Sequence, residues 1–171
     1  DSAGNIWCAN STHAETWPQA LDGRADGFIF VLTPDGTARI VAAGLKFPNG
    51  MAMSADESVL YCAQTSGADV MAFPVLDGAR LGPGERYGPV LGKLQGPGVD
   101  HNDLGYTDGV GLDAEGNLWV CLPAANKVVA IAPDGSVTTV IHDPTGQVVN
   151  HPTNVTWGGP DLRDLYIGSI R

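Results

Sequence analysis

Asp113-Ala-Glu-Gly-Asn-Leu-Trp119 is the segment that decides the fold, because versions of it recur along the chain. Asp1-Ser-Ala-Gly-Asn-Ile-Trp7 repeats its order of a small polar turn, a glycine and an apolar residue before an aromatic one. Looser copies occupy residues 54–61 and 159–166. The closing aromatic residues stand 54, 58 and 47 residues apart. This spacing is typical of β-propeller blades and too long for leucine-rich or ankyrin repeats.

A second pattern lies between these copies, where β-rich runs are joined by Pro-Asp-Gly. The run 28–33 is followed by Pro34-Asp35-Gly36, and the run 127–132 is followed by Pro133-Asp134-Gly135. Each tripeptide leads into another β-rich run. Because glycine readily adopts the positive φ of a tight turn, the pattern predicts β-hairpins at both places.

The repeats predict an all-β chain that forms one partial β-propeller domain over residues 1–171. We expect about three to three and a half blades, near residues 1–44, 45–92, 105–142 and 150–171. The thirteen expected strands lie near residues 5–10, 28–33, 37–42, 49–54, 58–65, 69–74, 85–90, 107–113, 117–123, 127–132, 136–141, 152–157 and 164–168. Closed propellers commonly have four to eight blades, so we expect this sequence to be a fragment of a larger ring.

One long connection interrupts the strand pattern. Residues 14–21 contain Pro18 and are expected to form an inter-strand loop rather than a helix. The whole connection over residues 11–26 is long enough to act as a lid over one face of the propeller.

Composition excludes several classes of partner. Nineteen acidic residues against nine basic ones give a net charge of −10, and the only lysines are Lys46, Lys93 and Lys127. Nucleic acid is therefore not an expected partner, because phosphate binding needs clustered basic residues. No apolar stretch reaches 18 residues, so no membrane span is expected. The expected partner is a small-molecule substrate.

The cysteines indicate the compartment. Cys8, Cys62 and Cys121 form an odd count without Cys-x-x-Cys spacing, so we expect three buried free thiols and a cytoplasmic location. The oligomeric state is not defined by the sequence. An open ring would leave apolar blade faces uncovered, so the isolated chain is expected to aggregate or dimerise.

Candidate functional residues stand at the start of the first strand of successive blades. Asn49, Asp108 and Thr153 occupy the same place in Phe47-Pro-Asn-Gly-Met51, Tyr106-Thr-Asp-Gly-Val110 and His151-Pro-Thr-Asn-Val155. The innermost strands of a propeller line its central channel, so these side chains are expected to approach one point. Oxygen ligands of this kind suit a hard divalent cation. Asn-Gly and Asp-Gly are also ordinary turn dipeptides, which is the alternative interpretation.

These segments resemble the SMP-30/gluconolactonase/LRE-like family, and the resemblance runs from the segment at Asp1 to Tyr166. It implies a six-bladed propeller in the full-length parent and a calcium-dependent lactonase, a carboxylic ester hydrolase. Zn²⁺, Mn²⁺ or Mg²⁺ could replace Ca²⁺. The family's asparagine ligand falls on Asn49, and its aspartate ligand and proposed general base falls on Asp108. Two further family ligands, a glutamate and a second asparagine, have no counterpart in residues 1–171.

The resemblance implies that the metal polarises the carbonyl of a lactone, such as a sugar lactone, while Asp108 activates water. A phosphotriesterase-like hydrolase is the alternative within the same class. A non-catalytic binding propeller of the NHL type is the alternative from another class.

Four further polar residues are weaker candidates for a role in the site. His101 could contact substrate or relay protons, although a lone loop histidine is more often solvated. His13, in the candidate lid, has the same two interpretations. His151 is expected to cap a turn. Asn154 aligns with Gly50 and Gly109, so we expect it to support the site rather than bind the metal.

Overall fold

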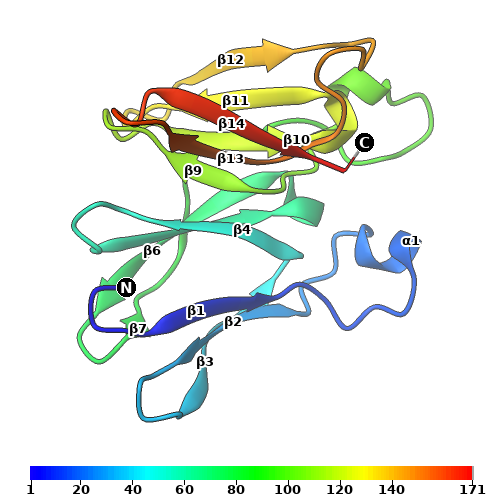
Figure 1. Ribbon diagram of the computed structural model, residues 1–171. Helices are drawn as coiled ribbons and strands as arrows, with labels where there is room; N and C mark the ends of the chain where they lie inside the picture. Colours follow the sequence, from blue (N-terminus) through cyan, green and yellow to red (C-terminus); the bar gives the residue numbers. More distant parts are fainter. Residues whose placement is uncertain (171) are drawn as a thin grey trace.

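The structure, a computed structural model, describes residues 1–170, which form short antiparallel strands gathered into sheets that follow one another along the chain (Figure 1). The first sheet has the order β1-β2-β3, with β1 (Ile6–Asn10), β2 (Gly27–Leu32) and β3 (Ala38–Leu45). The second has the order β4-β5-β6-β7, with β8 also paired to β6: β4 (Pro48–Met53), β5 (Val59–Gln64), β6 (Asp69–Leu76), β7 (Arg80–Leu81) and β8 (Glu85–Arg86).

The remaining two sheets lie at the C-terminal end of the described chain, in the upper part of Figure 1. The third has the order β12-β11-β10-β9, with β9 (Val110–Leu112), β10 (Leu118–Leu122), β11 (Lys127–Ile131) and β12 (Val137–His142). The fourth pairs β13 (Pro152–Gly158) with β14 (Asp164–Ser169). The all-β fold predicted from the repeats is confirmed. Arg171, the last residue of the fourth predicted blade, lies outside the described residues.

The recurring segment has a hydrogen-bonding reason for its composition. The indole Nε1–H of Trp119 donates to Asp113 Oδ2 over 2.9 Å, and Trp7 donates to Asp1 Oδ2 over the same distance. Each aspartate also accepts from the backbone and side-chain amides of the asparagine that stands two residues before the tryptophan. One carboxylate thus fixes both the turn and the aromatic residue that ends the segment.

The Pro-Asp-Gly turns form as expected. Gly36 and Gly135 have φ of 84° and 82°, which is the left-handed region that glycine tolerates. Their backbone N–H groups donate to Thr33 over 2.9 Å and to Ala132 over 2.8 Å. These turns connect β2 to β3 and β11 to β12, so both predicted hairpins are confirmed.

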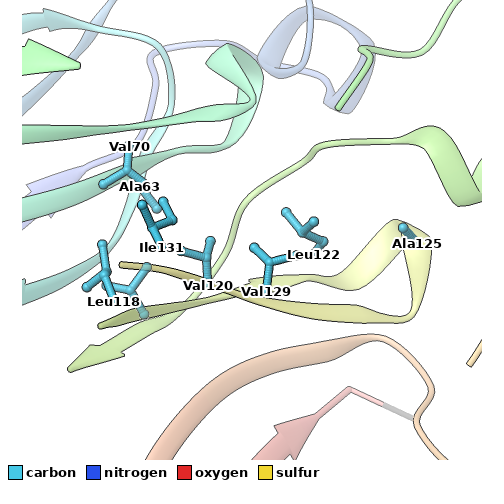
Figure 2. Close-up of a cluster of buried hydrophobic side chains, with 9 residues drawn as sticks. Ala63, Val70, Leu118, Val120, Leu122, Ala125, Val129 and Ile131 are labelled. Carbon is cyan, nitrogen blue, oxygen red and sulfur yellow. The ribbon is translucent and has the colours of Figure 1, made fainter. Parts of the chain in front are cut away.

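The largest apolar core lies between the second and third sheets (Figure 2). Ala63 and Val70 come from the second sheet, and they meet fully buried side chains of β10 and β11. The other labelled members are Leu118, Val120 and Leu122 of β10, Val129 and Ile131 of β11, and Ala125 of the turn between these two strands. Alternate residues of each strand supply this core, which follows from the two-residue repeat of a strand.

The cysteines are free thiols, as predicted. Cys62 and Cys121 are buried, and burial raises the pKa of each thiol to about 12. Cys8 is only partly buried, so the expectation of full burial is wrong there. Its neighbour Trp7 packs toward the second sheet, and successive side chains of a strand face opposite sides. Every described residue of β1 keeps at least part of its surface exposed.

Three local expectations are corrected. Residues 14–21 are not entirely loop, because α1 (Trp17–Ala20) forms one helical turn there. Pro18 stands in the first turn of α1, where a missing N–H breaks no helical hydrogen bond. The strand expected near 85–90 is reduced to β8, because Gly88 has a φ of 72° and Pro89 has no N–H to donate.

The strand expected over 107–113 begins only at Val110, so Asp108 lies just before β9. Short 3-10 turns occupy Thr65–Gly67, His101–Asp103 and Pro123–Ala125. All helices within residues 1–170 are too short to cross a membrane.

Candidate metal and substrate site

The first strands of neighbouring sheets lie in direct backbone contact. The Gly50 N–H donates to the Asp108 carbonyl over 3.2 Å, and the Gly109 N–H donates to the Thr153 carbonyl over 2.8 Å. A Cβ on Gly50 would lie 2.5 Å from that Asp108 oxygen, and a Cβ on Gly109 would overlap the Thr153 oxygen. Neither glycine has a positive φ. The Asn-Gly and Asp-Gly pairs are therefore close-approach sites, and the turn interpretation does not apply to them.

This approach gathers the aligned candidates around one pocket. The pocket has a volume of about 520 Å³, and its lining includes Asn49, Asp108, Thr153 and Asn154. The three residues aligned by their flanks are therefore neighbours in space. Asn154 is exposed and shares this lining.

Asn49 is oriented by a chain of hydrogen bonds. Its side-chain Nδ2 donates to Thr65 Oγ1 over 3.2 Å, and the Thr65 hydroxyl donates to the Thr107 carbonyl over 2.6 Å. Because the amide nitrogen is engaged by Thr65, the carbonyl oxygen Oδ1 is the group that Asn49 can offer to a ligand.

Asp108 is a half-buried carboxylate with a perturbed pKa. Burial raises the pKa of Asp108 to about 6, although a hydrogen bond from the Asn49 side chain opposes the shift. None of the ion pairs formed by residues 1–170 includes Asp108. A cation bound beside this carboxylate would stabilise its charged form.

The donor chemistry fits a hard cation such as calcium. Asp108 offers a carboxylate and Asn49 an amide oxygen, and calcium takes about six to eight oxygen ligands in proteins. Residues 1–170 contain no group of three or more His, Cys, Asp and Glu side chains arranged to hold a metal. The described residues therefore fit part of a calcium coordination sphere, and other oxygen donors would have to supply the rest.

A second pocket of about 230 Å³ meets the first at Asn49 and Asp108. His101 and His151 both line this second pocket, with ring centroids 6.4 Å apart and planes at 61°. His101 therefore lies beside the candidate site. His151 does more than end a turn, because it lines the pocket while its backbone N–H donates to Asn126 Oδ1 over 2.9 Å.

His13 lies away from both pockets. Its ring stacks on Phe28 with centroids 5.9 Å apart, and it does not contribute to the lining of either pocket. The candidate lid still reaches the site through its helical turn, because Trp17 and Leu21 line the second pocket. In Figure 1, α1 projects from the right-hand side of the sheets.

The sequence reasoning missed a set of ring side chains around this pocket. Phe47, Tyr106 and His151 all line it, and each stands two residues before one of the aligned candidates Asn49, Asp108 and Thr153. The same alignment contains the signal, because an aromatic ring recurs at one position of the repeat. Trp17 carries no such signal, since it comes from the connection over residues 11–26.

The fold defines this chain as part of a β-propeller. Its structure is similar to that of regucalcin, a calcium-binding protein from Agrobacterium tumefaciens, with a TM-score of 0.71 and 22% sequence identity. That similarity covers 99% of this chain and 50% of the other chain. The model of the SMP-30/Gluconolactonase/LRE-like region matches residues 1–171, and the chain belongs to this family.

Relatives within the family are named as lactonases. The chain is 30% identical over 170 residues to pentonolactonase XacC of Haloferax volcanii. That match covers 98% of this chain and 50% of the relative. It is also 30% identical over 172 residues to a 6-deoxy-6-sulfogluconolactonase of Pseudomonas putida. That match covers 100% of this chain and 52% of the relative. The chain spans about half the length of these curated relatives.

Proposed function

We propose that the protein containing residues 1–171 is a metal-dependent hydrolase of lactones, such as sugar lactones, and that calcium is its metal. Asn49 and Asp108 are proposed as two of the metal ligands, and Asp108 as the base that activates water. The juxtaposition of these two side chains where two pockets meet is the observation that carries this proposal. The lactonase names of two relatives support the reaction class.

The roles of the two residues follow from their surroundings. Calcium held by Asn49 and Asp108 would supply a Lewis acid for the lactone carbonyl. Asn49 offers Oδ1 in a fixed direction, because Thr65 holds its Nδ2. The Asp108 carboxylate accepts a proton from the attacking water. Burial raises its pKa to about 6, and a cation bound beside it would lower that pKa again.

Hydrolysis of D-glucono-1,5-lactone tests the proposal. The acid product is followed by proton release, with the spontaneous rate subtracted, in calcium and after its removal with EGTA. We expect calcium-dependent hydrolysis that collapses in Asp108→Asn, because this change removes charge and basicity but keeps an oxygen ligand. Asp134→Asn, in an exposed hairpin turn, is the matched control and should retain the wild-type rate.

The same assay separates the alternatives. A phosphotriesterase-like hydrolase would turn over a phosphotriester such as paraoxon faster than the lactone. A non-catalytic NHL-type propeller would hydrolyse neither substrate. Calcium-independent lactone hydrolysis that survives Asp108→Asn would refute the assigned roles.

A further inference from the structure

The smaller pocket has an aromatic wall that the proposed chemistry does not use. Trp17 and Phe47 stack with ring centroids 6.2 Å apart and planes at 24°. Both rings line the pocket beside Asn49 and Asp108. The Trp17 residue is nevertheless 71% exposed. A large ring held by stacking at a pocket, with most of its surface in water, has a face available to a ligand.

The segment that carries Trp17 is anchored at several points. Ala20 of α1 is 4% exposed, which fixes the helical turn against the sheets. The Asp26 carboxylate accepts from Thr12 Oγ1 and from the His13 N–H, each over 3.1 Å, and so ties the two ends of the connection together. Arg24 and Asp22 form an ion pair at 2.9 Å within it. Trp17 is thus presented by an ordered segment, which lowers the entropic cost of using it for binding.

The other walls of this pocket carry polar groups. His101, Tyr106 and His151 line the pocket, and the Nδ1 of His151 is already hydrogen-bonded to Asn150 Oδ1. The Tyr106 hydroxyl accepts a hydrogen bond from the Gln95 backbone N–H over 2.9 Å. The Tyr106 O–H remains able to donate to a ligand. The pocket therefore combines one apolar aromatic wall with hydrogen-bonding groups, a combination that suits a ring with a C–H face and hydroxyl edges.

The volume of this pocket sets the scale of the part of a ligand that it can hold. At about 230 Å³ the pocket is smaller than the roughly 300–1,000 Å³ typical of sites for drug-sized molecules. A single sugar-sized ring matches this scale, and any larger ligand would extend past Asn49 and Asp108 into the first pocket.

We propose that Trp17, supported by Phe47, is a specificity-determining residue that stacks on the C–H face of a hydroxylated, monosaccharide-sized lactone ring. In this arrangement the ring hydroxyls face His101, Tyr106 and His151, and the carbonyl faces Asn49 and Asp108. The part of this inference that concerns lactone hydrolysis rests on the proposed function. The part that concerns binding of the ring is argued from the residues of the pocket alone.

Two lactones that differ in their hydroxyl groups test the inference kinetically. For Trp17→Ala, we expect the KM for D-glucono-1,5-lactone to rise about fivefold to tenfold with little change in kcat, which is the scale of one aromatic contact. The KM for δ-valerolactone, which has no hydroxyls to position its ring, should change less than twofold. Trp17→Phe should restore most of the loss, and Ile40→Ala, at another exposed apolar residue, should change nothing.

Binding of 1,5-anhydro-D-glucitol, a stable ring without a carbonyl, separates this inference from the proposed reaction. Ligand-observed NMR should show saturation transfer to its ring C–H protons with wild type and a clear loss with Trp17→Ala. This result would support the stacking role even if wild type hydrolysed no lactone. Equal binding by wild type and Trp17→Ala, or equal rises in KM for both lactones, would overturn it.

Discussion

The backbone N–H of Gly50 donates to the carbonyl of Asp108 over 3.2 Å, and this bond joins the first strand of one sheet to the segment that opens the next. It brings Asn49 and Asp108 into one pocket although they are far apart in the sequence. The glycine is required because a Cβ at position 50 would lie 2.5 Å from the Asp108 oxygen. Site geometry and blade packing therefore depend on the same close approach.

Gly109→Ala tests that dependence. The added Cβ would overlap the Thr153 carbonyl, so the two sheets must separate, and we expect a loss of about 1–3 kcal/mol in the free energy of unfolding. Thermal and urea unfolding measure the change. Gly96→Ala is the matched control, because its new Cβ would meet Val99 at an ordinary 3.8 Å. Equal stability of the two variants would show that the close approach is not tight.

Asp113→Ala should destabilise the third sheet. The change removes the carboxylate that accepts hydrogen bonds from the Trp119 indole and from both amides of Asn117. These donors then have only water as a replacement partner. We expect a loss of about 1–3 kcal/mol in the free energy of unfolding, together with a change in tryptophan fluorescence. Asp134→Ala, which removes an exposed turn carboxylate that accepts from Ser136, should cost clearly less. A similar cost for both variants would argue against the role assigned to the repeated aspartate.

In contrast to Asp113→Ala, Asp108→Asn should increase the stability of the protein when calcium is removed. Burial raises the pKa of Asp108 to about 6, above its usual 3.8, so the folded state binds this proton more tightly than the unfolded state does. The stability contributed by the protonated form is present below about pH 4 and is lost as the pH rises through about 6. In EGTA, Asp108→Asn should therefore unfold at a higher temperature than wild type at pH 8, with the difference shrinking toward pH 4.

Asp134→Asn supplies the control of opposite sign. Hydrogen bonds from Ser136 lower the pKa of Asp134, so its charged form contributes stability that is present above the unfolded pKa and lost on acidification. This variant should be slightly less stable than wild type at pH 8. If Asp108→Asn were also less stable than wild type at pH 8 without calcium, the account of Asp108 as a half-buried carboxylate outside the ion pairs of residues 1–170 would be wrong.

Much of the fold could be predicted from the sequence, because its signals are local. The Pro-Asp-Gly hairpins and the repeat ending at Trp119 depend on turn chemistry within a few residues. Alignment of the repeats by their flanking residues places Asn49 and Asp108 at equivalent positions, and the structure brings both to one pocket. Their role as metal ligands stays a prediction.

The parts that could not be predicted depend on contacts between distant segments. The bond from Thr65 to the Thr107 carbonyl joins residues 42 apart in the sequence, and no local pattern marks it. The stacking of Trp17 on Phe47 likewise joins two different connections. Pro18 predicts a loop from the sequence alone, but a proline interrupts a helix only in its interior, and Pro18 stands in the first turn of α1.

Calcium titration by isothermal calorimetry tests most directly the claim that Asn49 and Asp108 hold one cation. The comparison uses the protein containing residues 1–171, its Asn49→Ala and Asp108→Ala variants, the double variant, and Asp134→Ala as the control. We expect one calcium site whose affinity falls in each single variant and falls further in Asp108→Ala, which removes the charged ligand. The losses should be non-additive in the double variant, because both residues serve the same ion. Unchanged calcium binding in Asp108→Ala would contradict the account.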